Sequence, residues 1–399
     1  EDFFPPDFIA EYTGQIRAWF YVLHVIGAAL YDSPAYKNVV VEGVILGTDG
    51  RKMSKNYGNY PDPKELLQKY GGDALRLYLL SSPVMHGEDI IISEEAYRQQ
   101  VKGTMLILWN SYNFFITYAN VDAWDKDKKI KSENVLDKWI LSLLNKLVKE
   151  VSEDLDNYDT VATISKLQKF VDDFSTWYIR RSRDRVGPTA EDQKDKNKFY
   201  TTCHEVLTTL SKLLAPVVPF VSEEMFRNLT EEDSVHLASW PETNEDKIDD
   251  DLERKMDKVR EIVEKGHAKR KIAEIKLRQP LRELMYVDQI RLPIEFENLI
   301  KYELNILNVS YGNPTTQAHK DLGLQVTLAT EITPKLKSAG EARDIVRKIQ
   351  EERKKIGTKL DEKVDVQIED WPKEFESEIK RKALVSSISK GEFKVNPSK

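Results

Sequence analysis

The sequence predicts a multidomain protein that begins with the C-terminal part of a Rossmann-like α/β domain. An all-α helical bundle and a small α/β module follow. Three observations support this order. The 399 residues leave room for about two to four domains. Strand–loop–helix patterns precede Ser93, and long amphipathic helices follow it. Short strand patterns return after an acidic connection at 241–251. We place the domains at 1–130, 131–245 and 246–399.

Composition excludes several classes of protein. The chain is 40% hydrophobic and 32% charged with a net charge of −7, so any nucleic-acid contact must come from local basic patches. A single cysteine, Cys203, excludes a disulfide scaffold and a cysteine-based zinc site, and it suits a reducing cytosol. No apolar stretch approaches the roughly 18 residues needed to span a bilayer. We therefore expect a cytoplasmic location.

The first domain is expected to alternate helices with a buried strand. Apolar residues at helical spacing predict a helix over 14–31, after an extended opening that contains two prolines. The β-branched run at 38–46 predicts a strand buried on both faces of a parallel sheet. Two helices are expected next, over 63–70 and 71–82, with a Gly-Gly pair at the junction. In such domains, chemistry lies beyond the C-terminal ends of strands.

The middle of the chain is expected to be a helical bundle. Apolar residues recur on one helical face over 136–155, 161–178 and 207–214. Pro216 and Pro219 end the third stretch, and a short helix over 222–229 follows.

The last domain should combine one long helix with strands. The helix is expected over 252–275, and strands over 284–287, 324–329 and 364–370. A second helix over 340–357 should turn Ile345, Val346, Ile349 and Ile356 inward, and the last nine residues should be frayed.

The stretch "DGRKMSKNYGNYPDP" (49–63) carries the most chemistry. Lys52 and Lys55 flank Met53 and Ser54, directly after a turn-forming Asp-Gly. Nucleotidyl transfer needs positive charge near phosphate oxygens, and lysine supplies it on a long, mobile stem. Ser54 could donate a hydroxyl hydrogen bond or cap the following turn. Taken alone, a KxxK pair is more often an ordinary solvated loop.

The wider string resembles a known signature. "KMSKN" followed by "NYPDP" and "GGDALR" (71–76) is similar to the KMSKS region of class I aminoacyl-tRNA synthetases, and most similar to the isoleucyl-tRNA synthetase family. The resemblance continues in order through "EYTGQIRAWF", "WYIRRSRDR", "LAPVVPFVSEEMF" and "KLRQPLREL". It covers nearly the whole chain.

The resemblance implies ATP-dependent activation of isoleucine and its transfer to tRNA(Ile). Lys52, Met53, Ser54 and Lys55 would form the ATP-binding loop, with both lysines stabilising the phosphates as pyrophosphate leaves. The resemblance also implies that an aminoacyl-adenylate would contact Glu11, Gln15 and Trp19. From the residues alone, Gln15 could lie on an ordinary helix face and Trp19 in the core. Mg²⁺ is expected with ATP, without a dedicated protein cage.

Some family features differ or are missing. Asn56 stands where serine is common, Tyr12 where glycine is common, and Gly14 where aspartate is common. The last two changes bear on the adenylate contacts. His24 is only superficially similar to an HxGH signature, and we read it as structural. Since no HxGH motif and no editing insertion occur, we expect the C-terminal part of a longer enzyme that is inactive alone, and a monomer.

Two arginine- and lysine-rich segments are candidates for contact with tRNA. Trp177, Arg180, Arg181 and Arg183 combine aromatic and cationic side chains that can stack on unpaired bases and bind phosphates. The segment 265–278 has six Lys or Arg residues against one Glu, among them Lys269, Arg270 and Lys271. Solvated helix ends explain both patterns about as well.

Two other functions stay open. The chain could be a tRNA-anticodon-binding module without catalysis, or a valyl- or leucyl-tRNA synthetase relative. The intact lysine loop favours an enzyme, and the "GQIRAWF" and "NYPDP" strings favour the isoleucyl family.

Overall fold

The computed structural model describes residues 4–128, 130–313 and 323–398. These residues divide into two compact units, each assembled from three separate stretches of chain. One unit comprises residues 1–115, 143–180 and 203–248, and the other comprises 116–142, 181–202 and 249–399. The three sequence-predicted domain boundaries remain a proposal.

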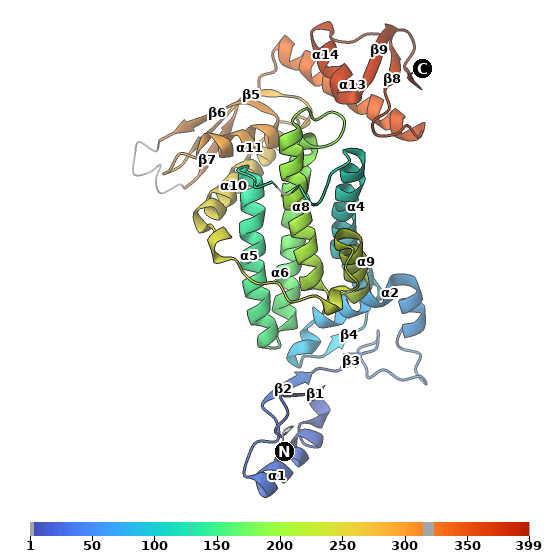
Figure 1. Cartoon of the computed structure of the whole chain (residues 1–399), viewed down its shortest axis with the longest axis vertical. Coiled ribbons are helices and arrows are strands. Elements are labelled where there is room, and N and C mark those ends of the chain that lie inside the picture. The colour runs from blue at the N-terminus through green and yellow to red at the C-terminus, as the bar shows by residue number, and fades with distance from the viewer. Residues whose placement is uncertain (1–3, 129, 314–322, 399) are drawn as a thin grey trace. The chain divides into compact units, whose positions relative to one another are not determined.

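The start of the chain is α/β, as its dark-blue and light-blue ribbon shows (Figure 1). Strands β1 (Phe8–Tyr12) and β2 (Asn38–Glu42) form one parallel pair. A second parallel pair joins β3 (Ile45–Leu46) to β4 (Ile90–Ile91). The helices of this part are α1 (Trp19–Tyr31), α2 (Pro63–Leu80) and α3 (Glu94–Gln100).

The single buried strand predicted over 38–46 is wrong. The run divides into β2 and β3, which belong to different sheets, and none of their residues is buried. Gly43 lies at the break, and its N–H donates to the Val84 carbonyl at 2.7 Å. A Cβ at Gly43 would lie 1.9 Å from the Glu88 carbonyl oxygen, so only glycine permits this approach.

Helix α1 is more exposed than its apolar sequence suggests. It begins at Trp19, after a 3₁₀ turn over Thr13–Gln15, rather than at residue 14. Only Phe20 and Gly27 in it are buried, whereas Leu30 is 70% exposed. Apolar periodicity correctly indicated a helix but not which of its faces is covered.

Helix α2 matches its prediction closely. The Asp62 side chain accepts a hydrogen bond from the Lys64 N–H at 2.8 Å and caps the N-terminus. Gly71 has φ 82° and ψ 166°, a conformation that interrupts the helix between its two predicted halves. A kink thus lies at the Gly-Gly pair, where the sequence predicted that one helix ends and the next begins.

The predicted helical stretches in the middle of the chain are present. Their buried faces are rich in leucine, isoleucine, valine and aromatic residues. Two π-helical segments, Val101–Met105 and Phe174–Ile179, interrupt the regular helices. The helices are α4 (Leu106–Val121), α5 (Val135–Asp156), α6 (Thr160–Asp173), α7 (Arg180–Ser182), α8 (Gln193–Leu214) and α9 (Pro219–Thr230).

Two three-stranded mixed sheets lie in the C-terminal third, shown in yellow-orange to red (Figure 1). The first has the order β6–β5–β7 and the second β10–β8–β9. Their strands are β5 (Leu281–Val287), β6 (Ile306–Gly312), β7 (Gln325–Leu328), β8 (Val364–Ile368), β9 (Val385–Lys390) and β10 (Lys394–Pro397). The helices are α10 (Asp250–Ile272), α11 (Ile294–Leu304), α13 (Pro334–Lys355) and α14 (Glu376–Ala383).

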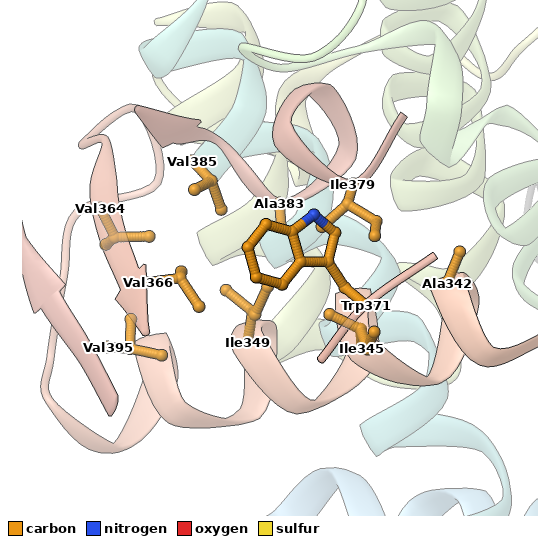
Figure 2. Close-up of a cluster of buried hydrophobic side chains, with 10 residues drawn as sticks. All are labelled: Ala342, Ile345, Ile349, Val364, Val366, Trp371, Ile379, Ala383, Val385 and Val395. Atoms are coloured by element: carbon orange, nitrogen blue, oxygen red, sulfur yellow. The ribbon is translucent and has the colours of Figure 1, made fainter. Parts of the chain in front are cut away.

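The end of the chain is not frayed, contrary to the prediction. Strand β10 pairs antiparallel with β8, so Val395 lies opposite Val366. Both valines belong to a core that the second sheet forms with α13 and α14 around Trp371 (Figure 2). Ile345 and Ile349 point into this core as predicted, but Ile356 is 41% exposed. It follows the end of α13, where the helical repeat no longer applies.

This core yields a matched test of stability. Ile349→Ala should lower the free energy of unfolding by about 2–5 kcal/mol, because it removes a fully buried side chain and leaves a cavity. Ile356→Ala is the control and should change it by less than about 1 kcal/mol. Urea unfolding of the whole chain measures both. Equal effects would contradict the assignment of Ile349 to the core.

Candidate functional site

The lysine loop, residues 47–59, follows the carboxyl end of β3. Lys52 forms an antiparallel bridge with Leu46, the last residue of that strand. Nearby, the Gly47 N–H donates to the Arg51 carbonyl at 2.7 Å. The loop therefore doubles back on its own strand, and these contacts fix the backbone of Lys52 next to the end of the parallel pair.

Lys55 lies in a tight turn that Ser54 organises. The Ser54 carbonyl accepts from the N–H groups of Tyr57 and Gly58 at 3.1 and 3.2 Å. The Ser54 hydroxyl accepts from the Asn56 N–H at 3.3 Å, which is the capping contact that the sequence suggested. Met53 packs partly buried against the core around Leu66 and Tyr78. The two lysines thus lie on either side of an apolar anchor.

Both lysine side chains are exposed to solvent. Among the residues that the structure describes, neither ammonium group forms an ion pair. Two mobile cations next to the carboxyl end of a parallel strand are suited to bind an oligophosphate. The arrangement is therefore compatible with the predicted ATP-binding loop of Lys52, Met53, Ser54 and Lys55.

Asp49 and Asn59 are loop residues whose roles the sequence did not reveal. Asp49 forms an ion pair with Arg51 at 2.6 Å, and the Arg51 guanidinium lies 4.7 Å from the centre of the Tyr57 ring. Hydrogen bonds from the Asn59 side chain, and from Arg51, lower the pKa of Asp49 to about 2. Asn59 directly precedes "YPDP", and this position after a Tyr-Gly turn was the only available signal.

The three predicted adenylate residues lie near one another in sequence at the end of β1 and the start of α1. Glu11 is in β1, and its carboxylate accepts from the Tyr12 N–H at 3.1 Å. The Gln15 side-chain oxygen accepts from the Trp19 N–H at 3.3 Å, so it holds the start of α1. Trp19 is 45% exposed, which makes it available to a ligand and excludes the core reading.

Trp177 does not match its predicted role in base stacking. Only 9% of its surface is exposed, and the neighbouring Tyr178 is fully buried. Both lie in the π-helical segment whose other residues include buried Phe174 and Ile179. Aromatic rings packed in this way present no free face to an RNA base. The pattern that suggested stacking belongs instead to the helical core.

The arginines that follow Trp177 differ in their surroundings. Arg180 donates from Nε to the Thr176 carbonyl at 2.8 Å. Arg181 forms an ion pair with the buried Glu303 carboxylate at 2.7 Å. Arg183 is exposed. Arg183 is therefore the most exposed of these three arginines, and Arg181 has a structural partner.

Arg270 is also misassigned as an RNA contact. It is 3% exposed and donates to the carbonyls of Leu304, Lys276, Gln279 and Asn305 at 3.0–3.2 Å. Burial lowers the pKa of its guanidinium to about 10. Arg270 thus shapes the loop that follows α10. Lys269 and Lys271, on either side of it, are exposed at the C-terminus of the helix, and their predicted contact with tRNA stays a prediction.

Within 4–128, 130–313 and 323–398, no group of three or more His, Cys, Asp or Glu side chains could hold a metal ion. The helices in that part of the chain are all too short or too polar to cross a bilayer.

Two family models match the sequence. Residues 1–92 match the class I tRNA synthetases of the I, L, M and V group. Residues 137–285 match the anticodon-binding domain of tRNA ligases. The lysine loop lies inside the first match, and the segments around Arg183 and Lys269 lie inside the second.

Curated relatives point the same way. The isoleucine–tRNA ligase of Chlamydia trachomatis serovar D is 43% identical over 321 residues, which are 79% of this chain and 31% of the relative. That of Treponema denticola is 42% identical over 77% of this chain and 30% of the relative. The chain thus spans about a third of the length of the curated relatives it matches.

A solved structure is more distantly similar. It is a ternary complex of the Agrobacterium radiobacter K84 LeuRS with tRNA and LeuAMS. The TM-score is 0.46 at 20% identity, over 61% of this chain and 29% of that one. This similarity is too low to support a conclusion about fold or function.

Proposed function

We propose that this chain belongs to the class I tRNA synthetases and that it supplies the lysine loop and the tRNA-binding part of an isoleucine–tRNA ligase. The observation that carries the proposal is the lysine loop at the end of β3. Its backbone is fixed at Lys52 and Ser54, while both lysine side chains remain exposed. The identity to isoleucine–tRNA ligases favours isoleucine over the valine and leucine alternatives.

The proposed reaction has two steps. The carboxylate of isoleucine attacks the α-phosphate of ATP and releases pyrophosphate. A 3′-terminal ribose hydroxyl of tRNA(Ile) then attacks the adenylate carbonyl, which forms the ester and releases AMP. Lys52 and Lys55 would neutralise charge that moves onto the departing pyrophosphate, which is a contribution made mainly in the transition state. Ser54 would hold the turn that carries Lys55. Glu11, Gln15 and Trp19 would contact the adenylate.

Magnesium enters the proposal only with ATP. The described residues offer no cluster of carboxylates or histidines that fits a protein-held ion. Mg²⁺ commonly binds phosphate oxygens and water instead. No step is therefore assigned to a metal held by this chain.

The tRNA-binding part of the proposal is supported by exposed cations within the anticodon-binding match. Arg183, Lys269 and Lys271 are exposed, whereas Trp177 and Arg270 are buried. Contact would thus depend on phosphates rather than on aromatic stacking at Trp177. Salt weakens such contact, because binding releases counterions from the phosphates and this release is less favourable when the salt concentration is high.

We expect the chain to bind tRNA(Ile) with an affinity that falls steeply as salt rises. Lys269→Ala with Lys271→Ala should weaken binding and reduce the slope of log affinity against log salt by about one to two, since each phosphate contact contributes about 0.7–0.9. Fluorescence anisotropy between about 50 and 200 mM salt measures the slope.

The matched control is Lys348→Ala with Lys354→Ala. It removes the same charge from exposed positions on α13. If both pairs weaken binding equally, the effect is one of net charge, and the α10 surface is not a specific contact. An affinity independent of salt would contradict the electrostatic surface altogether.

A further inference from the structure

We propose that Asn59 is a positioning residue that holds the lysine loop in the form able to bind phosphate. The inference rests on the proposed function, because it concerns how that loop presents its lysines. Asn59 is 6% exposed although it lies between two exposed loop residues and the polar start of α2. Its side chain is directed into the loop rather than into solvent, as its three hydrogen bonds show.

Each of those bonds joins a different part of the loop. The Oδ1 atom accepts from the Ser54 N–H at 3.0 Å, where the turn that carries Lys55 begins. The Nδ2 atom donates to the Lys52 carbonyl at 3.2 Å, next to the first lysine. It also donates to the Asp49 carboxylate at 2.8 Å. The Asn59 amide therefore connects the end of the loop to three parts of it: the Asp-Gly turn at Asp49, the backbone of Lys52 and the turn that begins at Ser54.

The backbone of Asn59 completes the connection. Its carbonyl accepts from the Thr48 N–H at 2.6 Å and from the Thr48 hydroxyl at 3.2 Å. A Cβ at Gly47 would lie 2.4 Å from this carbonyl oxygen and 2.5 Å from Nδ2. Glycine at position 47 is therefore required for Asn59 to approach so closely.

This arrangement explains how an exposed, Gly-containing loop can hold the backbone of both lysine segments at defined places. Backbone entropy would otherwise spread the lysines over many positions, at a cost that phosphate binding would have to overcome. An asparagine amide is well matched to the task because it supplies both an acceptor and two donors. Aspartate of similar shape would keep the acceptor for Ser54 but place a second carboxylate beside Asp49.

The test uses the full chain with inorganic pyrophosphate as the probe. Asn59→Ala should weaken pyrophosphate binding by about tenfold, since it removes three hydrogen bonds that order the loop. Asn59→Asp should weaken it at least as much. Asn56→Ala is the matched control, because it removes an exposed asparagine side chain from the same loop. Isothermal titration calorimetry measures the affinities.

A second readout reports on the bond between Asn59 and Asp49 without any ligand. The pKa of Asp49 is about 2, and the Asn59 amide is its largest cause. This lowered pKa favours the folded loop above the ordinary aspartate pKa, and the contribution is lost as pH falls toward 2. Asn59→Ala should therefore raise the pKa of Asp49, followed by the NMR shift of its carboxyl carbon. Asn56→Ala should leave it unchanged.

A double variant tests whether Asn59 acts through its hydrogen bond to Asp49 or only by filling space. Exchanging the partners, with Asp49→Asn and Asn59→Asp together, restores a donor–acceptor pair between positions 49 and 59. The double variant should bind pyrophosphate more tightly than Asn59→Asp alone. Gly47→Ala should reproduce the defect of Asn59→Ala with Asn59 still present.

The outcomes distinguish the role of Asn59 from the proposed function of the lysine loop. If the wild-type chain binds pyrophosphate and Asn59→Ala binds it equally well, the positioning role is refuted and the proposed function stands. If the wild-type chain binds no pyrophosphate, the proposed phosphate site itself fails. In that case an unchanged Asp49 pKa in Asn59→Ala would refute the hydrogen-bonded arrangement as well.

Discussion

Lys52→Ala and Lys55→Ala should each slow isoleucyl-adenylate formation by about 10²–10³-fold. That magnitude is typical for removing one group that stabilises charge developing in a transition state. The effect should fall mainly on kcat, and the KM for isoleucine should change little, because the lysines are proposed to act on phosphate. A suitable enzyme is a chimera in which this chain replaces the matching segment of the Chlamydia trachomatis isoleucine–tRNA ligase. Isoleucine-dependent exchange of pyrophosphate into ATP measures the rate.

Lys64→Ala is the matched control for these variants. Lys64 is an exposed lysine in the first turn of α2, outside the lysine loop. Its loss should leave exchange unchanged. Equal losses of kcat and of isoleucine affinity in Lys52→Ala would contradict a role confined to the phosphates. Lysine variants that stay as active as the wild-type chimera would refute the proposed catalytic role of the loop.

The sequence predicted helices and strands best where one repeat of apolar residues continues over a long stretch of chain. The helical stretches around Leu147, Val171 and Leu210 are present because each buries a continuous apolar face. The lysine loop was also predictable as a loop, because its motif is local and begins with a turn-forming Asp-Gly pair. What the motif did not contain was the role of Asn59, since a hydrogen bond across ten residues of loop depends on how the chain returns.

The sequence predicted burial less well than it predicted helices. The sequence patterns around Trp177 and Arg270 are equally compatible with exposed and with buried side chains. Tertiary packing buries both residues. The strand at 38–46 divided because Gly43 meets the backbone of Glu88, which is distant in sequence. In α1, apolar periodicity indicated the helix, but most of its apolar side chains remain exposed. Such contacts are not encoded in any local window.

Arg185 illustrates the same ambiguity with a larger energetic consequence. It belongs to the arginine-rich segment that suggested RNA binding, yet it forms two hydrogen bonds to the fully buried Asp137 carboxylate, at 2.7 and 2.8 Å. It also contacts Asp195 at 2.8 Å. A paired carboxylate in a core is tolerated because its partner compensates for the lost hydration.

Arg185→Ala should therefore lower the free energy of unfolding by about 3–5 kcal/mol, because it leaves the Asp137 charge buried without this partner. Arg185→Lys should be intermediate, since lysine keeps the charge but cannot form the paired hydrogen bonds. Arg183→Ala is the control at an exposed position and should cost less than about 0.5 kcal/mol. Urea unfolding of the whole chain measures all three.

A double-mutant cycle identifies the pair as the cause. Asp137→Ala removes the buried charge, so adding Arg185→Ala to it should cost less than Arg185→Ala costs alone. Additive losses would show that the two side chains act independently. If Arg185→Ala leaves unfolding unchanged but weakens tRNA binding, the arginine faces RNA in solution and the buried ion pair is refuted. Measuring both stability and tRNA binding in Arg185→Ala therefore separates a structural role of this arginine from a role in RNA contact.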